Sequence, residues 1–384
     1  MSHMVMVKGP SPLGSHSNCL EIDTHYKQQN AAAAAEAAAS AAATSAFGGA
    51  KHTSRYKGTH MTYALGKCGP LGTILQLEQQ RDCNADLVRR AVEQLRGRAL
   101  IFLGDSLMLQ QWLSALLMMA SFLKELRCPS LKGIYSRGYN GVPPFQCAQT
   151  TDWKQNKAGL RLCYTHRHPF HKNIARALEL QQKQWSVNDT LVMNSGMWHA
   201  DNLEQTNKTV TDVLRYSAKR QEKIPTLLWR ETSPAHFIVP YSAHECLDPP
   251  TCSFRNTTAP VGSVLPQCVP CSEADWRGCI TAMRHNEVAK ALLANSDAVK
   301  VVSIWNHSVK DWDAHLGLIN NRQNVTQLDC SHYCLPSPTV ESWTLEVFAE
   351  LTGVPARYSC DASMQPDRIE QETGPERVRY MTLA

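Results

Sequence analysis

The chain of 384 residues is 43% hydrophobic and 19% charged, with a formal net charge of +5. These values are typical of a globular protein with one large domain plus tails, or with two modest domains. The charge is spread along the chain without a basic stripe, which argues against a dedicated nucleic-acid-binding protein.

The N-terminal part differs from the rest in composition. Met1–Asn30 is polar and irregular, and Ala31–Ala50 is an alanine-rich low-complexity tract. Alanine favours helix, but this tract has no apolar face that could pack. We therefore expect residues 1–56 to be a disordered low-complexity region, followed by one domain over 57–360 and a tail over 361–384.

Short apolar runs alternate with segments of helical spacing from residue 73 onward. The runs predict strands at Thr73–Leu77, Ala99–Leu103, Thr190–Met193, Pro225–Trp229 and Ala298–Trp305. The spacing predicts helices at Asp86–Leu95, Val210–Gln221, Met283–Ala294 and Trp312–Ile319, with others beginning at Leu107 and running through Val340. This alternation predicts a mostly parallel sheet with helices on both faces.

A candidate nucleophile lies where the strand Ala99–Leu103 meets the following helix. The turn there reads Gly104-Asp105-Ser106. A serine in this place sits at the carboxyl end of a sheet strand, where open α/β sheets bind ligands, and near a helix N-terminus that favours negative charge. The alternative is that Ser106 only caps the helix.

A candidate base and its carboxylate lie far downstream. A serine hydroxyl needs a base to take its proton, usually a histidine, and that histidine needs a carboxylate to fix its tautomer. Asp329 and His332 are three residues apart, a spacing that predicts neighbouring side chains on one helical turn.

Three ordered blocks, taken together, resemble a known family. Leu95–Leu107, with Gln111 and Trp112 after it, carries Gly-Asp-Ser; Leu228–Phe237 carries Ser-Pro-Ala-His-Phe; Asp329–Pro336 reads Asp-Cys-Ser-His-Tyr-Cys-Leu-Pro. In this order they resemble the trichome-birefringence-like (PC-esterase) family of the SGNH/GDSL-like superfamily, with Tyr333 in place of a tryptophan.

The resemblance implies a fold and an activity. The fold would be a three-layer α/β/α SGNH-hydrolase-like sandwich with a mostly parallel sheet and disulfide-stapled loop insertions. Family members are polysaccharide O-acetyltransferases of the plant Golgi, which implies that Ser106 forms an acetyl-serine with His332 and Asp329 as the rest of the triad. An acetyl donor of unidentified chemistry and a polysaccharide or oligosaccharide acceptor would be the partners, and no cofactor is expected.

Residues around the predicted strand ends are candidates for oxyanion or substrate binding. Gly104 and Asp105 directly precede the nucleophile, and Asn194 and Gly196 follow the strand Thr190–Met193. An amide beside backbone N–H groups suits an oxyanion hole, and Asn194 resembles the asparagine of SGNH enzymes. An ordinary Asn-x-Gly turn is the alternative.

Arg230 and His236 follow the strand Pro225–Trp229 at the same edge of the predicted sheet. They either reach the substrate or hold their own loop through hydrogen bonds. The sequence alone leaves both roles open.

The chain departs from the family pattern in three places. Leu109 stands where the family usually has an arginine, three residues after the serine. Ile238–Cys252 replaces a Gly-Gly and Trp-rich segment, and the cysteine-rich module that precedes the serine block in the family is hard to recognise.

The sequence predicts no metal site. His166, His168 and His171 cluster around Pro169 without a carboxylate nearby, which favours a solvated turn. The fourteen cysteines are too dispersed for a single zinc site, although Cys268 and Cys271 form one Cys-x-x-Cys.

Cysteines and glycosylation motifs predict the secretory pathway. Glycosylation sequons begin at Asn188, Asn207, Asn256, Asn306 and Asn324. With the dispersed cysteines they favour a secretory lumen, in this family the Golgi, over free thiols in the cytosol. Disulfides at Cys330 and Cys334 would clamp His332 between them.

The resemblance also implies an N-terminal membrane tether. No run of eighteen apolar residues is visible, and Met1–Lys8 is too short for a signal-peptide core. We therefore expect a truncated or mis-started chain, or an unusual member.

Two alternative functions stay open. An acetyl esterase would use the same residues with water as the acceptor. A non-catalytic glycan-binding relative is the second alternative, suggested by the leucine at position 109.

Overall fold

The computed structural model describes part of the chain. The described residues are 16–18, 79–120, 122–123, 126–129, 146–150, 159–166, 178–179, 182–194, 202–220, 223–237, 268–272, 274, 276–320 and 326–358. The strand predicted at Thr73–Leu77, the tail 361–384 and the limits of the 57–360 domain lie outside these ranges. So does the region 1–56, apart from His16–Asn18, which forms the edge strand β1.

Eight of the described strands form one sheet in the order β1-β3-β4-β5-β2-β6-β7-β8. Their bounds are β1 His16–Asn18, β3 Leu126–Pro129, β4 Gln146–Thr150, β5 Arg161–His166, β2 Ala99–Gly104, β6 Thr190–Met193, β7 Thr226–Arg230 and β8 Val299–Val302. From β5 to β8 every neighbouring pair is parallel, whereas β1, β3 and β4 pair in antiparallel fashion. The mostly parallel sheet is therefore confirmed.

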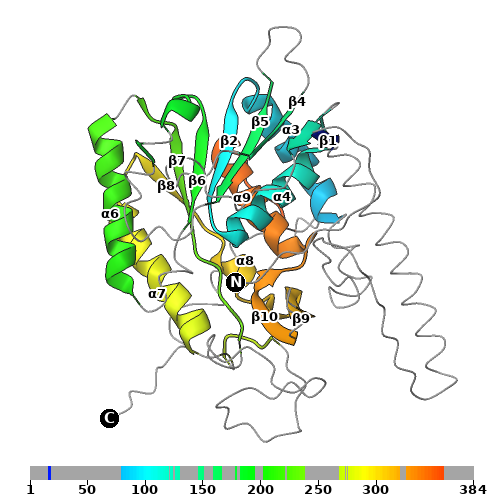
Figure 1. Cartoon of the computed structure of the whole chain (residues 1–384), viewed down its shortest axis with the longest axis vertical. Helices are drawn as coiled ribbons and strands as arrows, with labels where there is room; N and C mark the ends of the chain where they lie inside the picture. The colour runs from blue at the N-terminus through cyan, green and yellow to red at the C-terminus, as the bar shows by residue number, and fades with distance from the viewer. Residues whose placement is uncertain are drawn as a thin grey trace, which may run out of the picture.

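Helices cover both faces of this sheet (Figure 1). One layer contains α3 (Ala85–Gln94), α4 (Ser106–Ala120) and α9 (Pro338–Thr352), and the other contains α6 (Leu203–Arg220) and α7 (Trp276–Leu293). The predicted three-layer α/β/α sandwich is thus confirmed. Among the helices of the described ranges, none combines the length and hydropathy needed to span a bilayer.

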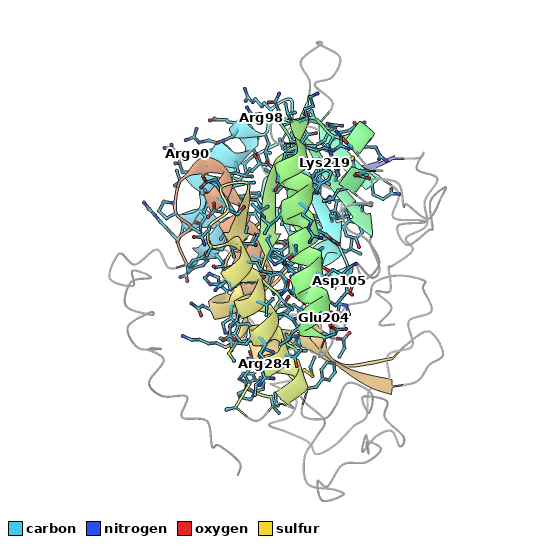
Figure 2. The ribbon with its side chains drawn as sticks, turned by 90° about the vertical axis from the view of Figure 1, so that its left-hand side faces the viewer. Arg90, Arg98, Asp105, Glu204, Lys219 and Arg284 are labelled. Atoms are coloured by element: carbon cyan, nitrogen blue, oxygen red, sulfur yellow. A yellow bond between two sulfur atoms is a disulfide. The ribbon has the colours of Figure 1, made fainter. Side chains whose placement is uncertain are left out.

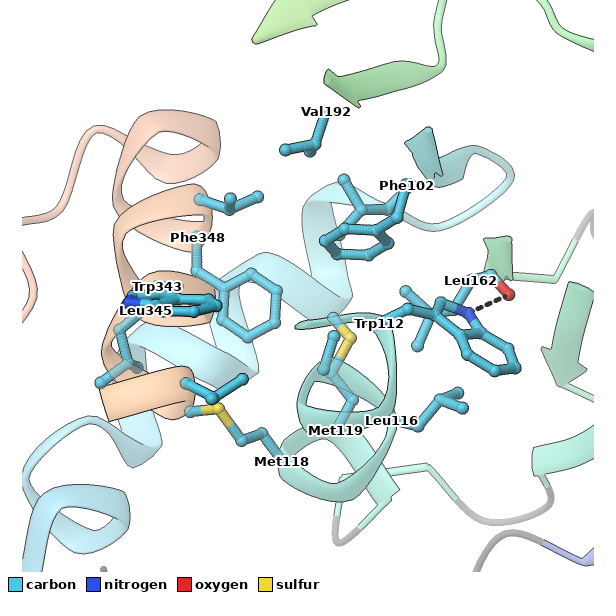
Figure 3. Close-up of a cluster of buried hydrophobic side chains, with 14 of the residues drawn as sticks. Phe102, Trp112, Leu116, Met118, Met119, Leu162, Val192, Trp343, Leu345 and Phe348 are labelled. Carbon is cyan, nitrogen blue, oxygen red and sulfur yellow. Dashed lines mark hydrogen bonds between the residues drawn. The ribbon is translucent and has the colours of Figure 1, made fainter. Parts of the chain in front are cut away.

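Successive side chains of the central strand β2 point alternately into the two hydrophobic cores. Leu100 and Phe102 pack with α3, α4 and α9, whereas Ile101 and Leu103 pack with α6 and α7. Figure 3 shows Phe102 in the first core, where the buried Trp112 donates its Nε1–H to Leu162 O at 3.0 Å. Fully burying one such apolar side chain contributes about 1.5–3 kcal/mol, so a strand that is buried on both faces anchors the turn that follows it.

The segment after β8 differs from the predicted helix at Trp312–Ile319. β8 ends at Val302, and the short helices α8 (Trp305–Ser308) and η8 (Trp312–Ala314) follow. Then β9 (His315–Asn320) and β10 (Thr326–Tyr333) form an antiparallel pair, separate from the large sheet. The helix prediction is wrong because Gly317 has φ +66°, a left-handed conformation that interrupts an α-helix.

The carboxyl ends of β2, β6 and β7 meet at one edge of the sheet because these strands are parallel neighbours. Figure 2 shows Arg98, which precedes β2, near one end of the molecule and Asp105, which follows β2, toward the other. The amino end of β2 is fastened by the fully buried Asp189. Its Oδ1 accepts the N–H of Ala99 at 2.6 Å, and its Oδ2 accepts the N–H of Ser186 at 2.7 Å.

We predict that Asp189→Ala destabilises the protein by about 2–4 kcal/mol, because two backbone N–H groups lose their acceptor. Urea unfolding followed by circular dichroism would measure the change. Asp86→Ala is the matched control, since Asp86 forms exposed ion pairs with Arg89 and Arg90 and its loss should leave stability nearly unchanged. Equal midpoints for the two variants would contradict the role of Asp189.

Candidate active site

The structure brings Ser106, His332 and Asp329 into one hydrogen-bonded chain. Ser106 Oγ lies 2.6 Å from His332 Nε2, and His332 Nδ1 lies 2.8 Å from Asp329 Oδ2. Asp329 is 1% and His332 7% exposed, whereas Ser106 is half-buried. These contacts leave the nucleophilic oxygen as the accessible end of the chain.

Ser106 is the first residue of α4, but the neighbouring Asp105, and not Ser106, caps the helix. Asp105 Oδ1 accepts the N–H of Leu107 at 3.0 Å, so Asp105 caps the helix and leaves the serine hydroxyl to meet His332. Gly104 is required by close packing, because a Cβ there would lie 2.3 Å from Met108 Cγ. The turn thus presents Ser106 at the N-terminus of α4, where the helix dipole favours negative charge.

Asp329 and His332 lie on the strand β10 and not on the helical turn predicted for them. In a regular strand, residues three apart point to opposite faces. Here the pairing with β9 is irregular between Asp329 and Tyr333. Asp329 Oδ1 accepts the backbone N–H groups of Ser331 at 3.2 Å and of His332 at 3.0 Å. This bulge turns the carboxylate and the imidazole toward each other.

A disulfide holds the same segment. Cys330, between Asp329 and His332, is bonded to Cys268 with an S–S distance of 2.07 Å, and Cys334 is also disulfide-bonded. The two cysteines of the Cys-x-x-Cys therefore do not pair with each other, since Cys271 bonds to Cys279. The described cysteines that flank His332 are oxidised, as disulfide clamping of the histidine requires.

Among the residues that the structure describes, one group of potential metal ligands occurs, and it does not suit a cation. His236 and the sulfurs of Cys271 and Cys279 lie within 4.8 Å of one another. Because the two sulfurs form a disulfide, neither can act as a thiolate ligand. Of the histidines 166, 168 and 171, the side chains lie outside the described residues.

Charge and burial set the protonation of the Asp329–His332 pair. Burial alone would raise the pKa of Asp329, but the His332 charge and hydrogen bonds from His332 and Ser331 lower it to about 2. Burial acts to lower the pKa of His332, yet the Asp329 charge and hydrogen bond raise it above the ordinary histidine value. The neutral form that can accept a proton from Ser106 is therefore favoured only at higher pH than for a free imidazole.

Asn194 and Arg230, at the ends of β6 and β7, are joined to each other. The Asn194 amide donates to Arg230 O at 2.8 Å and to Thr232 Oγ1 at 3.1 Å. Both N–H groups of Asn194 are thus occupied, so an oxyanion would have to displace one of these acceptors. Gly196, the other candidate at this strand end, lies outside the described residues.

Arg230 and His236 both point into the protein interior. Each has no exposed surface. The Arg230 guanidinium lies 4.7 Å from the centre of the Trp343 ring, and burial lowers its pKa to about 10 although Asp105, Tyr333 and Glu231 act in the opposite direction. His236 Nδ1 lies 2.7 Å from His315 Nε2. His236 makes the hydrogen-bond contacts that the loop-holding alternative requires. Among the described residues, none of the three Arg230 guanidinium nitrogens has a hydrogen-bond partner, so that alternative is supported for His236 alone.

Two residues near the site, Gln110 and His315, could not be identified as site residues from the sequence. Gln110, one helical turn after Ser106, donates Nε2–H to Tyr333 O at 2.6 Å and accepts the N–H of Tyr333 with Oε1 at 3.1 Å. His315 Nδ1 lies 3.1 Å from the carbonyl oxygen of His332. Their partners are backbone groups, which residue types and spacing do not reveal.

We predict that Asp329→Asn lowers the pKa of His332 below the ordinary histidine value, because burial is then opposed only by the weaker effect of the Asp105 charge. NMR titration of the His332 ring measures the shift. Asp313→Asn is the control, since Asp313 acts on His236 and not on His332. An unchanged His332 titration in Asp329→Asn would show that the pair is not coupled.

The sequence matches the family described as the GDSL/SGNH-like acyl-esterase family found in Pmr5 and Cas1p (PC-esterase) over residues 88–344. It is also similar to "Protein trichome birefringence-like 9" of Arabidopsis thaliana, with 23% identity over 293 residues that cover 68% of this chain and 67% of that protein. The matched range includes all the candidate residues discussed above.

Proposed function

The chain belongs to the PC-esterase family, and from this premise we propose that it is an O-acetyltransferase that moves an acetyl group onto sugar hydroxyls of a polysaccharide. The observation that supports this most directly is the 2.6 Å contact between Ser106 Oγ and His332 Nε2, backed by Asp329. A serine, a histidine and a carboxylate in this order are the parts needed for acyl transfer.

The proposed reaction has two halves. His332 Nε2 takes the proton of Ser106 as Oγ bonds to the acetyl carbonyl carbon of the donor. The tetrahedral intermediate then breaks its bond to the donor's leaving group, which receives the proton from His332, and acetyl-Ser106 is formed. In the second half, His332 accepts the proton of a sugar hydroxyl as the sugar oxygen bonds to the carbonyl carbon of acetyl-Ser106. The tetrahedral intermediate then breaks the bond between that carbon and Ser106 Oγ, which takes the proton from His332, and the acetylated sugar leaves.

Negative charge on the carbonyl oxygen needs hydrogen-bond donors in each half. We propose the backbone N–H of Ser106, at the N-terminus of α4, as one donor. Asn194 and Gly196 remain the candidates at the end of β6, and Asn194 would exchange its bond to Thr232 Oγ1 for one to the oxyanion. Asp105 and Gly104 would shape the turn and not contact the substrate.

The proposal includes the partners and the compartment. The acceptor is a polysaccharide or oligosaccharide, and the acetyl donor is a second substrate, so the scheme needs neither a metal nor another cofactor. The disulfides Cys147–Cys163, Cys268–Cys330 and Cys271–Cys279 support folding in an oxidising compartment. We therefore place the protein in the secretory pathway, with the Golgi lumen as the specific proposal.

A non-catalytic glycan-binding relative remains the contrasting candidate. Leu109, where the family usually has an arginine, is 2% exposed and packs in the hydrophobic core, so it offers no charge to a substrate. The retained hydrogen-bonded chain from Ser106 to Asp329 favours catalysis, because a binding module has no need of an activated serine.

We predict that Ser106→Ala reduces turnover of an activated acetyl ester by about a thousandfold or more, because the nucleophile is removed. Timed assays with nitrophenyl acetate measure the turnover, and thermal unfolding checks that the variant is folded. Ser114→Ala is the matched control, since Ser114 lies buried on the same helix and bonds Met118 and Thr344. Activity near wild type in a folded Ser106→Ala protein would refute the nucleophile.

We predict that a xylan- or mannan-like oligosaccharide diverts acetyl from water onto sugar. A transferase must protect its acetyl-serine from water until the acceptor binds. Mass spectrometry of the oligosaccharide, alongside measurement of free acetate, gives the partition between transfer and hydrolysis. Fast acetate release that no glycan acceptor alters would instead identify an acetyl esterase.

A further inference from the structure

Behind the candidate base lies a pair of buried histidines that the proposed reaction does not use. His236 is 0% and His315 3% exposed. Their facing nitrogens, His236 Nδ1 and His315 Nε2, lie 2.7 Å apart. His315 belongs to β9, and His236 follows β7, so two separate parts of the chain meet here.

Each ring also faces a backbone carbonyl with its second nitrogen. His315 Nδ1 lies 3.1 Å from His332 O, and His236 Nε2 lies 3.3 Å from Val309 O. The two histidines therefore form a row of three contacts that ends on the peptide group of the candidate base. A carbonyl oxygen can only accept a hydrogen bond, so both outer contacts need an N–H on the imidazole.

Counting protons assigns the tautomers of this row. Three contacts need three N–H groups, but two neutral imidazoles carry only two. The 2.7 Å contact between His236 and His315 must hold one, since two lone pairs at that distance would repel. Of the outer contacts, the one to His332 O is shorter by 0.2 Å than the one to Val309 O, and we assign it the second N–H.

This assignment makes the row directional. His315 then carries its hydrogen on Nδ1, which donates to His332 O, and receives a hydrogen bond on Nε2 from Nδ1–H of His236. A third proton would satisfy Val309 O as well, but burial opposes it: burial lowers the pKa of His236 to about 4 and holds the pKa of His315 well below the ordinary value. The charged groups that act on the pair are Asp313, Asp329 and His332.

We propose that His315 is a positioning residue for His332, held in its Nδ1–H tautomer by His236. The proposal rests on the proposed function, in which His332 is the base. Gln110 fixes the peptide groups of Tyr333 from the side of α4, and His315 fixes the preceding carbonyl from the side of β9. Together they orient the imidazole toward Ser106, and a small displacement of such a group is enough to slow acyl transfer.

The test compares two substitutions of His315, each of which places an amide near one of the two ring nitrogens. The amide of His315→Asn takes the place of Nδ1–H and keeps a donor for His332 O. The longer side chain of His315→Gln reaches toward the Nε2 position and loses that donor. We expect kcat to fall about tenfold or more in His315→Gln with KM unchanged, and to stay within a few-fold of wild type in His315→Asn.

The matched control is His307→Gln, since His307 is partly exposed and bonds Glu346 at 3.0 Å. It should leave kcat unchanged. Equal kcat for His315→Asn and His315→Gln, with Ser106→Ala inactive, would overturn the positioning role and leave the proposed function standing. Full activity of Ser106→Ala would overturn the proposed function itself.

A measurement on the unmodified protein covers the case in which the variants do not fold. Long-range nitrogen–proton NMR spectra distinguish a protonated Nδ1 from a protonated Nε2 in a neutral imidazole. We expect His315 and His236 both to carry the hydrogen on Nδ1 at neutral pH. A hydrogen on His315 Nε2, which would leave His332 O without its donor, would overturn the proposal without any reference to activity.

Discussion

The hydrogen bond between Ser106 and His332 joins residues 226 positions apart, and the rest of the site depends on it. Its two ends belong to different units, because Ser106 starts a helix of the main sheet and His332 lies on a separate two-stranded ribbon. No sheet hydrogen bond fixes the distance between them. Gln110 of α4 instead bonds the backbone of Tyr333 on the ribbon. The Cys268–Cys330 disulfide and the hydrogen bond from His236 N–H to Cys330 O at 2.9 Å attach the ribbon to other segments.

The interior behind the site also holds a continuous column of rings. His236, His315, Tyr333 and Trp343 follow one another with centroid distances of 4.9, 4.1 and 5.0 Å, and the Arg230 guanidinium lies 4.7 Å from the last ring. A fully buried cation is costly unless neighbouring groups favour it. The Trp343 face and the nearby Asp105 and Glu231 charges partly offset that cost, while the three guanidinium nitrogens have no hydrogen-bond partner among the described residues.

The parallel half of the fold could be predicted because strands buried on both faces are continuous apolar runs, as in Ala99–Leu103. The β9–β10 ribbon could not, since Trp312, Leu316 and Ile319 fit helical spacing equally well. The sequence predicted which residues form the Ser106–His332–Asp329 chain, but it did not predict their local geometry. That geometry depends on a strand bulge closed by backbone donors, and hydrophobic periodicity carries no information about such bonds.

The buried carboxylate that fastens β2 has a consequence for modification. Asp189 is the middle residue of the sequon Asn188-Asp189-Thr190, in which Asn188 is exposed whereas Asp189 and Thr190 are buried. An enzyme that attaches a glycan must grip the threonine as well as the asparagine, and in the folded protein that threonine is the first residue of β6. If Asn188 carries a sugar chain, that chain has to be added to the nascent polypeptide, before the sheet closes over its own acceptor motif.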